Sequence, residues 1–352
     1  MIPERVSRAL RSRKLEERAG AVEALARIET PEATALLVGL LRDRFHYVGE
    51  LAARALAQRQ DPDTAPALVE AFAWLGEAGR TRDPGCRIRT ELAIALGNLR
   101  EYGAADILFA GLRTVQVEPS GMSMVDTAVG LRGACALALA EIRPSGALLP
   151  LSLLLHGAIL GADSQYVPVE TSEAVARALG NLGEPAALPV LATRLANARS
   201  APAEVVAACM DAIGALDPPE VVELLSPFLR PSALAGAAGR GGDGTGAFLA
   251  ARAALALAST RRAEVLPLLL HCLAGAPDSA LEPVAIAIAN LRSDEARGAL
   301  MRLAGDAPPP VRAAAVAALA LFPDDEVRAL LRRLAERDTS PKVREAARRA
   351  AA

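Results

Sequence analysis

The chain has 352 residues and a formal net charge of −2, and its composition is 52% hydrophobic but only 3% aromatic. The near balance of charge gives no general attraction to nucleic acid or to an anionic membrane surface. Aromatic side chains usually supply much of the buried area of a large globular core. A chain that is apolar without them favours thin layers of closely packed helices.

Targeting signals and cysteine pairs are not found. Residues 1–20 lack the apolar segment of a secretory signal, and no uninterrupted apolar run reaches the roughly 18 residues of a membrane span. Lys14 and Lys342 are the only lysines, which is typical of arginine-rich proteins from GC-rich bacteria. Disulfides are rare in the cytoplasm. We therefore expect a cytoplasmic protein with four reduced thiols, at Cys86, Cys135, Cys209 and Cys272.

An alanine-rich segment closed by leucine or isoleucine recurs along the chain. The spacing is 31 residues at both ends, as from Leu25 to Leu56 and from Ile288 to Leu319, and it is mostly longer between them. Ala351 would close a further, truncated repeat. The nine positions are Leu25, Leu56, Leu96, Leu139, Leu179, Ile213, Leu257, Ile288 and Leu319.

Each repeat is predicted to contain two helices, and the first begins at a turn that proline or aspartate often marks. Proline suits a first helical turn because its missing N–H would be unpaired there. The second helix is richer in alanine, and we expect some second helices to end in a left-handed residue at Gly97-Asn98, Gly180-Asn181 and Asn290. The first helices are expected at 31–42, 61–78, 103–115, 144–159, 184–198, 218–230, 262–274, 294–305 and 324–337.

A single helix pair of this kind cannot cover its own apolar face. Stacked pairs bury a continuous core in which each repeat contacts its neighbours. The only β-like fragment, at 115–117, is too short to predict a strand. We therefore predict an all-α fold: one solenoid of about nine helical hairpins over residues 1–352.

The segment 310–349 carries the repeat most clearly, as PVRAAAVAALALFPDDEVRALLRRLAERDTSPKVREAARR. Its Val-Arg-x-x-Ala-x-x-Ala-Leu pattern, followed by Pro-Asp-Asp-Glu-Val-Arg, resembles the HEAT repeat, and above all the PBS-lyase HEAT-like subtype. The resemblance covers nearly the whole chain and is weaker at 120–170 and 231–250. It implies an alpha-alpha superhelix in which the second helices line a concave face. The commonest role of the family is to hold a partner protein.

The middle of the chain carries extra residues between a first helix and the next second helix. We predict inserted loops at 79–87, 118–130, 161–171 and 231–246. Such loops either carry function or are tolerated because lengthening a surface loop costs little. A G-x-G-x-x-G pattern at Gly239, Gly241 and Gly244 lacks the preceding strand that a dinucleotide site requires, so it indicates a flexible linker.

The residues predict no catalytic group, metal or cofactor. Some relatives are di-iron hydroxylases with His-Glu pairs, whereas His46, His156 and His271 are not followed by glutamate. Other relatives attach bilins, and no cofactor motif is recognisable here. Acidic residues interleave with the basic clusters at both ends, which is typical of solvated helix faces and not of a basic groove for nucleic acid. A bilin lyase-like enzyme and a nucleic-acid-binding protein remain the alternatives.

Helical periodicity places the third, fourth and seventh positions of each second helix away from the core. This face mixes charges with the apolar residues Ile94, Leu137, Leu255 and Ile286. Either they form a contact patch for a protein or peptide partner, or curvature buries them between repeats. We expect a non-catalytic scaffold, with no membrane contact and with its oligomeric state open. The candidate binding residues are Glu50, Arg54, Glu91, Ile94, Leu137, Glu173, Arg177, Arg252, Leu255, Glu282 and Ile286.

Overall fold

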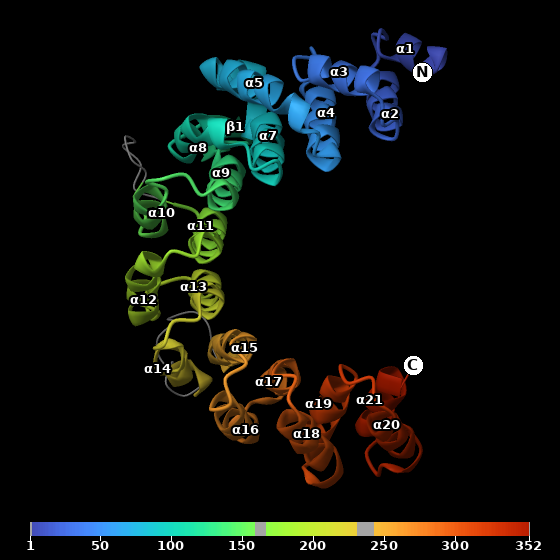
Figure 1. Cartoon of the computed structure of the whole chain (residues 1–352), viewed down its shortest axis with the longest axis vertical. Helices are drawn as coiled ribbons and strands as arrows, with labels where there is room; N and C mark the ends of the chain where they lie inside the picture. Colours follow the sequence, from blue (N-terminus) through green and yellow to red (C-terminus); the bar gives the residue numbers. More distant parts are fainter. Residues whose placement is uncertain (1, 159–166, 231–242, 352) are drawn as a thin grey trace. The chain divides into compact units, whose positions relative to one another are not determined.

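The computed structural model describes residues 2–158, 167–230 and 243–351 (Figure 1). Contacts within the chain divide it into two compact units, Met1–Leu182 and Gly183–Ala352, which we call unit 1 and unit 2. The prediction of one continuous solenoid over both units stays a prediction, and each unit is described by itself.

Unit 1 consists of antiparallel helix pairs in two layers (Figure 1). The first helices are α1 (Glu4–Ala9), α3 (Pro31–Leu40), α5 (Ala65–Glu77), α8 (Ala105–Leu112) and α10 (Leu148–Leu155). The second helices are α2 (Leu15–Ala26), α4 (His46–Arg59), α7 (Arg87–Asn98), α9 (Val129–Ile142) and α11 (Val169–Leu182). Each second helix packs against its own first helix and against the second helices beside it.

Unit 2 repeats this two-layer arrangement. Its first helices are α12 (Leu188–Ala196), α14 (Val221–Leu225), α16 (Val265–Gly275), α18 (Asp294–Asp306) and α20 (Asp325–Arg337). Its second helices are α13 (Ala203–Leu216), α15 (Asp243–Ser259), α17 (Asp278–Asn290), α19 (Pro309–Leu319) and α21 (Pro341–Ala351). Short 3-10 turns precede or follow several helices, as at Ser226–Leu229 after α14. Each unit is therefore an α-solenoid of stacked helix pairs, which confirms the predicted fold class.

The core of both units is built on the repeated leucine or isoleucine of the second helices. All nine repeat positions, from Leu25 to Leu319, are buried. Small residues let the second helices approach closely: a Cβ atom at Gly97 of α7 would lie 2.9 Å from Cα of Ala138 on α9. No helix in the described part of the chain is long and apolar enough to cross a membrane.

The prediction of the helix ends was wrong in detail. Gly97 and Asn98 belong to α7, and the left-handed residue is Arg100, with φ of 52°. At the other two expected ends the left-handed residue also lies later in the chain than predicted, at Gly183 and Arg292, which have positive φ. Non-glycine residues also end α4, α9 and α13 in this conformation, at Gln60, Arg143 and Asp217.

The predicted loops at 79–87 and 118–130 carry regular structure. Residues 79–87 form the short helix α6 (Gly79–Arg82) and a 3-10 turn, Pro84–Cys86. The prediction that strands are absent was wrong here, because residues 117–126 form an antiparallel β-hairpin of β1 (Val117–Ser120) and β2 (Ser123–Asp126).

The other two predicted loops are described only in part. Helix α11 begins at Val169 and α15 at Asp243, so the ends of 161–171 and 231–246 are helical. Residues 161–166 and 231–242 of these loops lie outside the described residues. Of the predicted glycine linker, Gly244 belongs to α15, whereas Gly239 and Gly241 lie outside the described residues.

Candidate functional site

The predicted binding residues of unit 1 lie on the outward surface of its second helices, which we call the second-helix face. None of them is buried. Helical periodicity explains this result, because positions three or four residues apart share one side of a helix. In unit 1 they are Glu50 and Arg54 on α4, Glu91 and Ile94 on α7, Leu137 on α9, and Glu173 and Arg177 on α11.

Ion pairs join neighbouring second helices across this face. Arg54 Nη2 lies 3.0 Å from Glu50 on its own helix and 2.8 Å from Glu91 on α7. The hydrogen bond and charge of Glu91 raise the pKa of Arg54 above its ordinary value. Arg87 lies 3.6 Å from the second oxygen of Glu50. The pairs hold α4 and α7 in register, although exposed ion pairs of this kind contribute only about 0.2–1 kcal/mol each.

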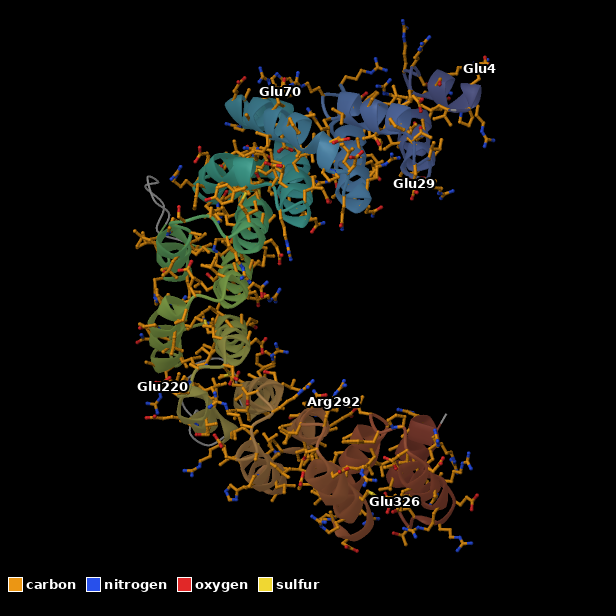
Figure 2. The ribbon with its side chains drawn as sticks, in the orientation of Figure 1. Glu4, Glu29, Glu70, Glu220, Arg292 and Glu326 are labelled. Carbon is orange, nitrogen blue, oxygen red and sulfur yellow. The ribbon has the colours of Figure 1, made fainter. Side chains whose placement is uncertain are left out.

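Ion pairs alone do not distinguish this face. In the layer of first helices, Glu70 projects from α5 (Figure 2) and lies 2.7 Å from Arg42. The second-helix face also carries apolar residues beside these charges: Ile94 is 40% exposed, and Leu137 on the neighbouring helix is half-buried. Curvature therefore does not bury Ile94 between repeats. Its role in partner binding stays a prediction.

In unit 2 the predicted residues lie on α15 and α17. Arg252 pairs with Asp211 of α13, while Leu255 and Ile286 are half-buried. Glu282 lines a groove of about 510 Å³ that α17, α19 and α21 form. Its walls carry acidic residues on α17 and basic residues on α21, and its lining includes Asp278, Glu282, Ala313, Ala317, Lys342 and Arg349.

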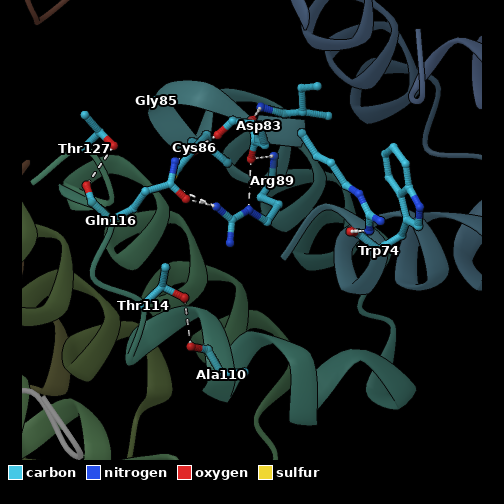
Figure 3. A network of polar contacts seen from close by, with 12 residues as sticks. Trp74, Asp83, Gly85, Cys86, Arg89, Ala110, Thr114, Gln116 and Thr127 are labelled. Carbon is cyan, nitrogen blue, oxygen red and sulfur yellow. Dashed lines mark hydrogen bonds and ion pairs between the residues drawn. The ribbon is translucent and has the colours of Figure 1, made fainter. Parts of the chain in front are cut away.

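A polar network that the sequence pattern does not predict holds the β-hairpin of unit 1 (Figure 3). Arg89 of α7 is buried, and its Nε donates to Asp83 at 2.9 Å. Its Nη2 donates to Gln116 Oε1 at 2.7 Å. The amide of Gln116 in turn donates to the Asp83 carbonyl oxygen at 3.0 Å and to Glu118 at 2.6 Å. The network therefore joins α7, the 3-10 turn before it and the first strand.

A second buried arginine holds the second strand at the same end of the β-hairpin. Arg132 of α9 donates to the Thr114 carbonyl oxygen at 2.8 Å, and its Nη2 lies 2.7 Å from Asp126. Burial by itself would raise the pKa of Asp126. The ion pair with Arg132 and hydrogen bonds from the backbone N–H groups of Ala128 and Gln116 outweigh burial and hold this pKa below its ordinary value. The carboxylate is therefore charged at neutral pH and binds the guanidinium.

A hollow of about 380 Å³ lies between this β-hairpin and the start of α4 and α7. Its lining includes His46, Tyr47, Glu50, Asp83, Arg87, Glu118 and Val125. His46 Nε2 lies 3.0 Å from the carbonyl oxygen of Thr81. The only sequence signal for the β-hairpin is its turn. Gly121-Met122 separates two short segments, and glycine suits the positive φ of 60° that Gly121 adopts there.

The thiols of the chain lie in the core. Cys86, Cys135, Cys209 and Cys272 are free and buried. Burial raises the pKa of Cys86 and Cys209 to about 12 and that of Cys272 to about 11, so these thiols stay protonated. In the residues that the structure describes, no group of three or more His, Cys, Asp or Glu side chains is arranged to hold a metal ion.

Solved structures with similar folds include proteins of quite different kinds. One is the complex of CpcE and CpcF of phycocyanin lyase from Nostoc sp. PCC7120, with 19% identity, 77% of this chain and 95% of that chain covered, and a TM-score of 0.41. Another is human deoxyhypusine hydroxylase in complex with glycerol, with 19% identity, 98% and 93% covered, and a TM-score of 0.30. For yeast importin-beta (Kap95p) the identity is 14%, the coverage 99% and 56%, and the TM-score 0.49. No curated protein matches the sequence.

Models of protein families match three segments of the chain. The model for HEAT repeats matches residues 2–73 and 282–352. The model for the PBS lyase HEAT-like repeat matches residues 173–197, which include most of α11 and α12. These segments belong to the same two-layer stack of helix pairs as the rest of each unit. The chain therefore contains HEAT repeats at 2–73 and 282–352 and a repeat of the PBS lyase HEAT-like type at 173–197.

Proposed function

We propose that this HEAT-repeat protein is a non-catalytic scaffold that binds a protein or peptide segment on its second-helix face. The observation that carries the proposal is Ile94, a large apolar residue that is 40% exposed among ion pairs on the layer of second helices. Folding gains nothing from leaving this surface uncovered, whereas a partner that covers it gains about 25 cal/mol for each Å² of apolar area. The four free thiols fit a reducing compartment such as the cytoplasm.

The groove of unit 2 supports the same role. Alanine side chains of α19 let the backbone of a bound segment approach closely, as small residues do between packed helices. The carboxylates of Asp278 and Glu282 attract basic residues of that segment, and Lys342 and Arg349 attract acidic ones. Opposite charges on the two walls therefore favour one orientation of the bound segment.

The test compares partner capture by matched variants of the full chain. Ile94→Asp places a charge on the second-helix face, and Leu149→Asp places the same charge on α10, where Leu149 is 64% exposed in the layer of first helices. Both variants should keep the helical circular dichroism and the melting temperature of the wild type. Proteins captured from the native host are quantified by mass spectrometry.

We expect Ile94→Asp to lose a captured partner by about tenfold or more, which corresponds to about 1.4 kcal/mol, while Leu149→Asp retains it. If both variants capture the partner equally well, the second-helix face of unit 1 is ruled out as the binding surface. Unfolding of Ile94→Asp alone would assign this side chain to the core. A purified protein that carries a bound chromophore or metal would favour the lyase-like alternative, and salt-dependent binding of a DNA duplex would favour the nucleic-acid alternative.

A further inference from the structure

The groove of unit 2 exists because α19 carries unusually small side chains. Two residues before the repeated leucine or isoleucine, the other eight repeats have a charged or large apolar residue, whereas α19 has Ala317. Pro310, Ala313 and Ala320 also line the groove, so this side of α19 forms its floor over nearly the whole helix. Helices α17 and α21 lie on either side of α19 (Figure 1) and form the two walls.

The same repeat departs from the pattern a second time, at the end of this floor. Leu321 directly follows Ala320 and is 54% exposed. It lies two residues after the repeated Leu319, where no other repeat has a large apolar residue. The corresponding residues are Arg27, Gln58, Asn98, Glu141, Asn181, Ala215, Ser259 and Asn290. An exposed leucine at a position that is otherwise polar or small indicates a surface that another apolar group covers.

The two walls carry opposite charges that the chain itself does not neutralise. Asp278 and Glu282 lie in the first half of α17, and Lys342 lies at the start of α21. In the part of the chain that the structure describes, the side chains of these three residues form no ion pair or hydrogen bond. Arg349, on the same wall as Lys342, is already paired with Glu345 at 3.0 Å. The acidic wall is therefore free to bind a cation and Lys342 to bind an anion.

The chemistry of the floor selects the conformation of the bound segment. Proline and alanine side chains offer no hydrogen-bond donor or acceptor, and the backbone groups inside α19 bond to one another. An extended segment on this floor would bury N–H and C=O groups without partners, which is costly. A helix satisfies these groups internally, and its diameter is about 10 Å. It fits between two walls whose axes lie two helix spacings, about 16–20 Å, apart.

We propose that the groove of unit 2 binds one amphipathic helix of a partner protein, which lies along α19. This inference rests on the proposed function and deepens it, because it names the kind of segment that is bound. Small side chains of the bound helix pack on the alanine floor. A basic residue on one flank meets Asp278 and Glu282, and an acidic residue on the other flank meets Lys342. An apolar residue about three turns away covers Leu321.

The positions of these contacts determine which flank of the bound helix carries which charge. The unpaired charges lie towards one end of the groove and Leu321 lies at the other, about 16 Å away along α19. A helix that places a leucine beside Leu321 turns one particular flank to the acidic wall, because a helix cannot be superposed on its mirror image. Exchanging lysine and glutamate between the flanks would bring like charges together at both walls.

The probes are two fluorescein-labelled peptides of about 18 residues, which span the groove with about one turn to spare at each end. Both carry alanine on the inner side and leucine near the C-terminus. Near the N-terminus one flank carries lysine and the other glutamate, and the two peptides differ only in which flank carries which. A covalent bridge on the outer side keeps these short peptides helical. Fluorescence anisotropy measures binding to the full-length wild type and its variants.

We expect one peptide to bind the wild type about tenfold or more tightly than the other. The double variant Glu282→Lys/Lys342→Glu exchanges charges between the walls, so it should prefer the other peptide. Ala317→Gln fills the floor and Leu321→Ser removes the apolar end, and each should weaken the preferred peptide by about tenfold. Ala329→Gln is the matched control, because Ala329 is exposed on α20, and it should bind like the wild type.

Three results would overturn the proposal. The first is equal binding, or no measurable binding, of the two peptides to the wild type. The second is equal binding of the preferred peptide to Ala317→Gln and Ala329→Gln, when both keep the wild-type melting temperature. The third is a dimer of the wild type that Ala317→Gln abolishes in sedimentation, which would assign the groove to a second copy of the chain.

The proposed function can fail separately from this inference. Ile94 lies in unit 1, so Ile94→Asp should leave binding of both peptides unchanged. If Ile94→Asp loses the host partner while the two peptides bind equally, the helix-binding groove is refuted and the proposed function stands. If Ile94→Asp keeps the partner while the peptides bind differently, the second-helix face of unit 1 is refuted and the groove stands.

Discussion

Arg89 of α7 donates a hydrogen bond of 2.7 Å to Gln116, which lies 27 residues later and directly before β1. The same guanidinium binds the buried carboxylate of Asp83, so one side chain links α7 to both structured insertions of unit 1. The link explains why a β-hairpin with few apolar contacts of its own keeps a defined place beside the helices.

The first prediction concerns this buried ion pair. Replacing Arg89 by methionine leaves Asp83 charged and buried without its partner, which should lower the free energy of unfolding by about 3–5 kcal/mol. Arg87→Met is the matched control on the same helix, because its ion pair with Glu50 is exposed and contributes about 0–1 kcal/mol. Urea denaturation followed by circular dichroism measures both. Similar losses for the two variants would show that the buried pair does not stabilise the insertions.

The second prediction concerns pH and unit 2. The hydrogen bonds from Arg312 hold the pKa of Asp338 below its ordinary value of 3.8, with N–O distances of 2.8 and 3.0 Å. A group whose pKa is lower in the folded state adds stability above its unfolded pKa, and this stability is lost as the pH falls through the folded value. We expect the stability to fall steeply below pH 3.8 in the wild type and less steeply in Asp338→Asn.

At neutral pH Asp338→Asn should also cost about 1.5–3 kcal/mol, because it weakens a hydrogen-bonded charge pair that is largely buried. Asp325→Asn is the control, since Asp325 pairs with Arg328 at the surface. Thermal unfolding between pH 2 and pH 7 measures the slopes. Parallel slopes for the wild type and Asp338→Asn would contradict the assignment of the titrating carboxylate.

The third prediction concerns the approach of α7 and α9. An alanine at Gly97 would place its Cβ 2.9 Å from Cα of Ala138, so the two helices would have to separate. We expect Gly97→Ala to destabilise the protein by about 1–3 kcal/mol, the usual cost of overpacking a core. Gly39→Ala on α3 should be neutral or should stabilise by up to about 1 kcal/mol, because no atom lies within 4 Å of the added Cβ. Melting temperatures compare the two, and equal shifts would contradict the close packing.

The fourth prediction concerns the cysteines. Their burial and the raised pKa values, about 12 for Cys86 and Cys209, should keep all four thiols unreactive in the folded protein. A thiol-reactive dye should label four thiols in denaturant and almost none under native conditions at pH 8. Rapid native labelling of a single thiol would instead indicate an accessible, activated cysteine and would reopen the enzyme alternative.

Much of the fold could be predicted because the repeat leaves a periodic signal. The recurring leucine, as at Leu96 and Leu139, is buried in every repeat, since each second helix meets its neighbours with the same side. The same periodicity also predicted which side of each second helix is accessible, and Arg54 and Ile94 are exposed on that side. The pairing of Arg54 with Glu91 could not be predicted, because it depends on how α4 and α7 are aligned.

The missed features depend on contacts between distant residues. In the sequence Gly97 resembles a helix end. It is a glycine inside α7 because Ala138 on the next second helix leaves no room for a Cβ atom. The ends themselves use arginine, glutamine or aspartate in the left-handed conformation, as at Gln60, and these residues give no local signal. The β-hairpin has only a weak turn signal, and its stability comes from Arg89 and Arg132 on the helices that flank it.

The two buried guanidiniums have a consequence for engineering the array. Repeat proteins can often be shortened, lengthened or shuffled one module at a time, since each module is nearly self-sufficient apart from its neighbours. Here Arg89 of α7 donates to Gln116 and Arg132 of α9 pairs with Asp126, and both partners lie in the segment before α9, so the modules that contain α7 and α9 must be transplanted or deleted as one block. Cutting between α7 and Gln116 would leave one buried N–H group of Arg89 without its amide acceptor.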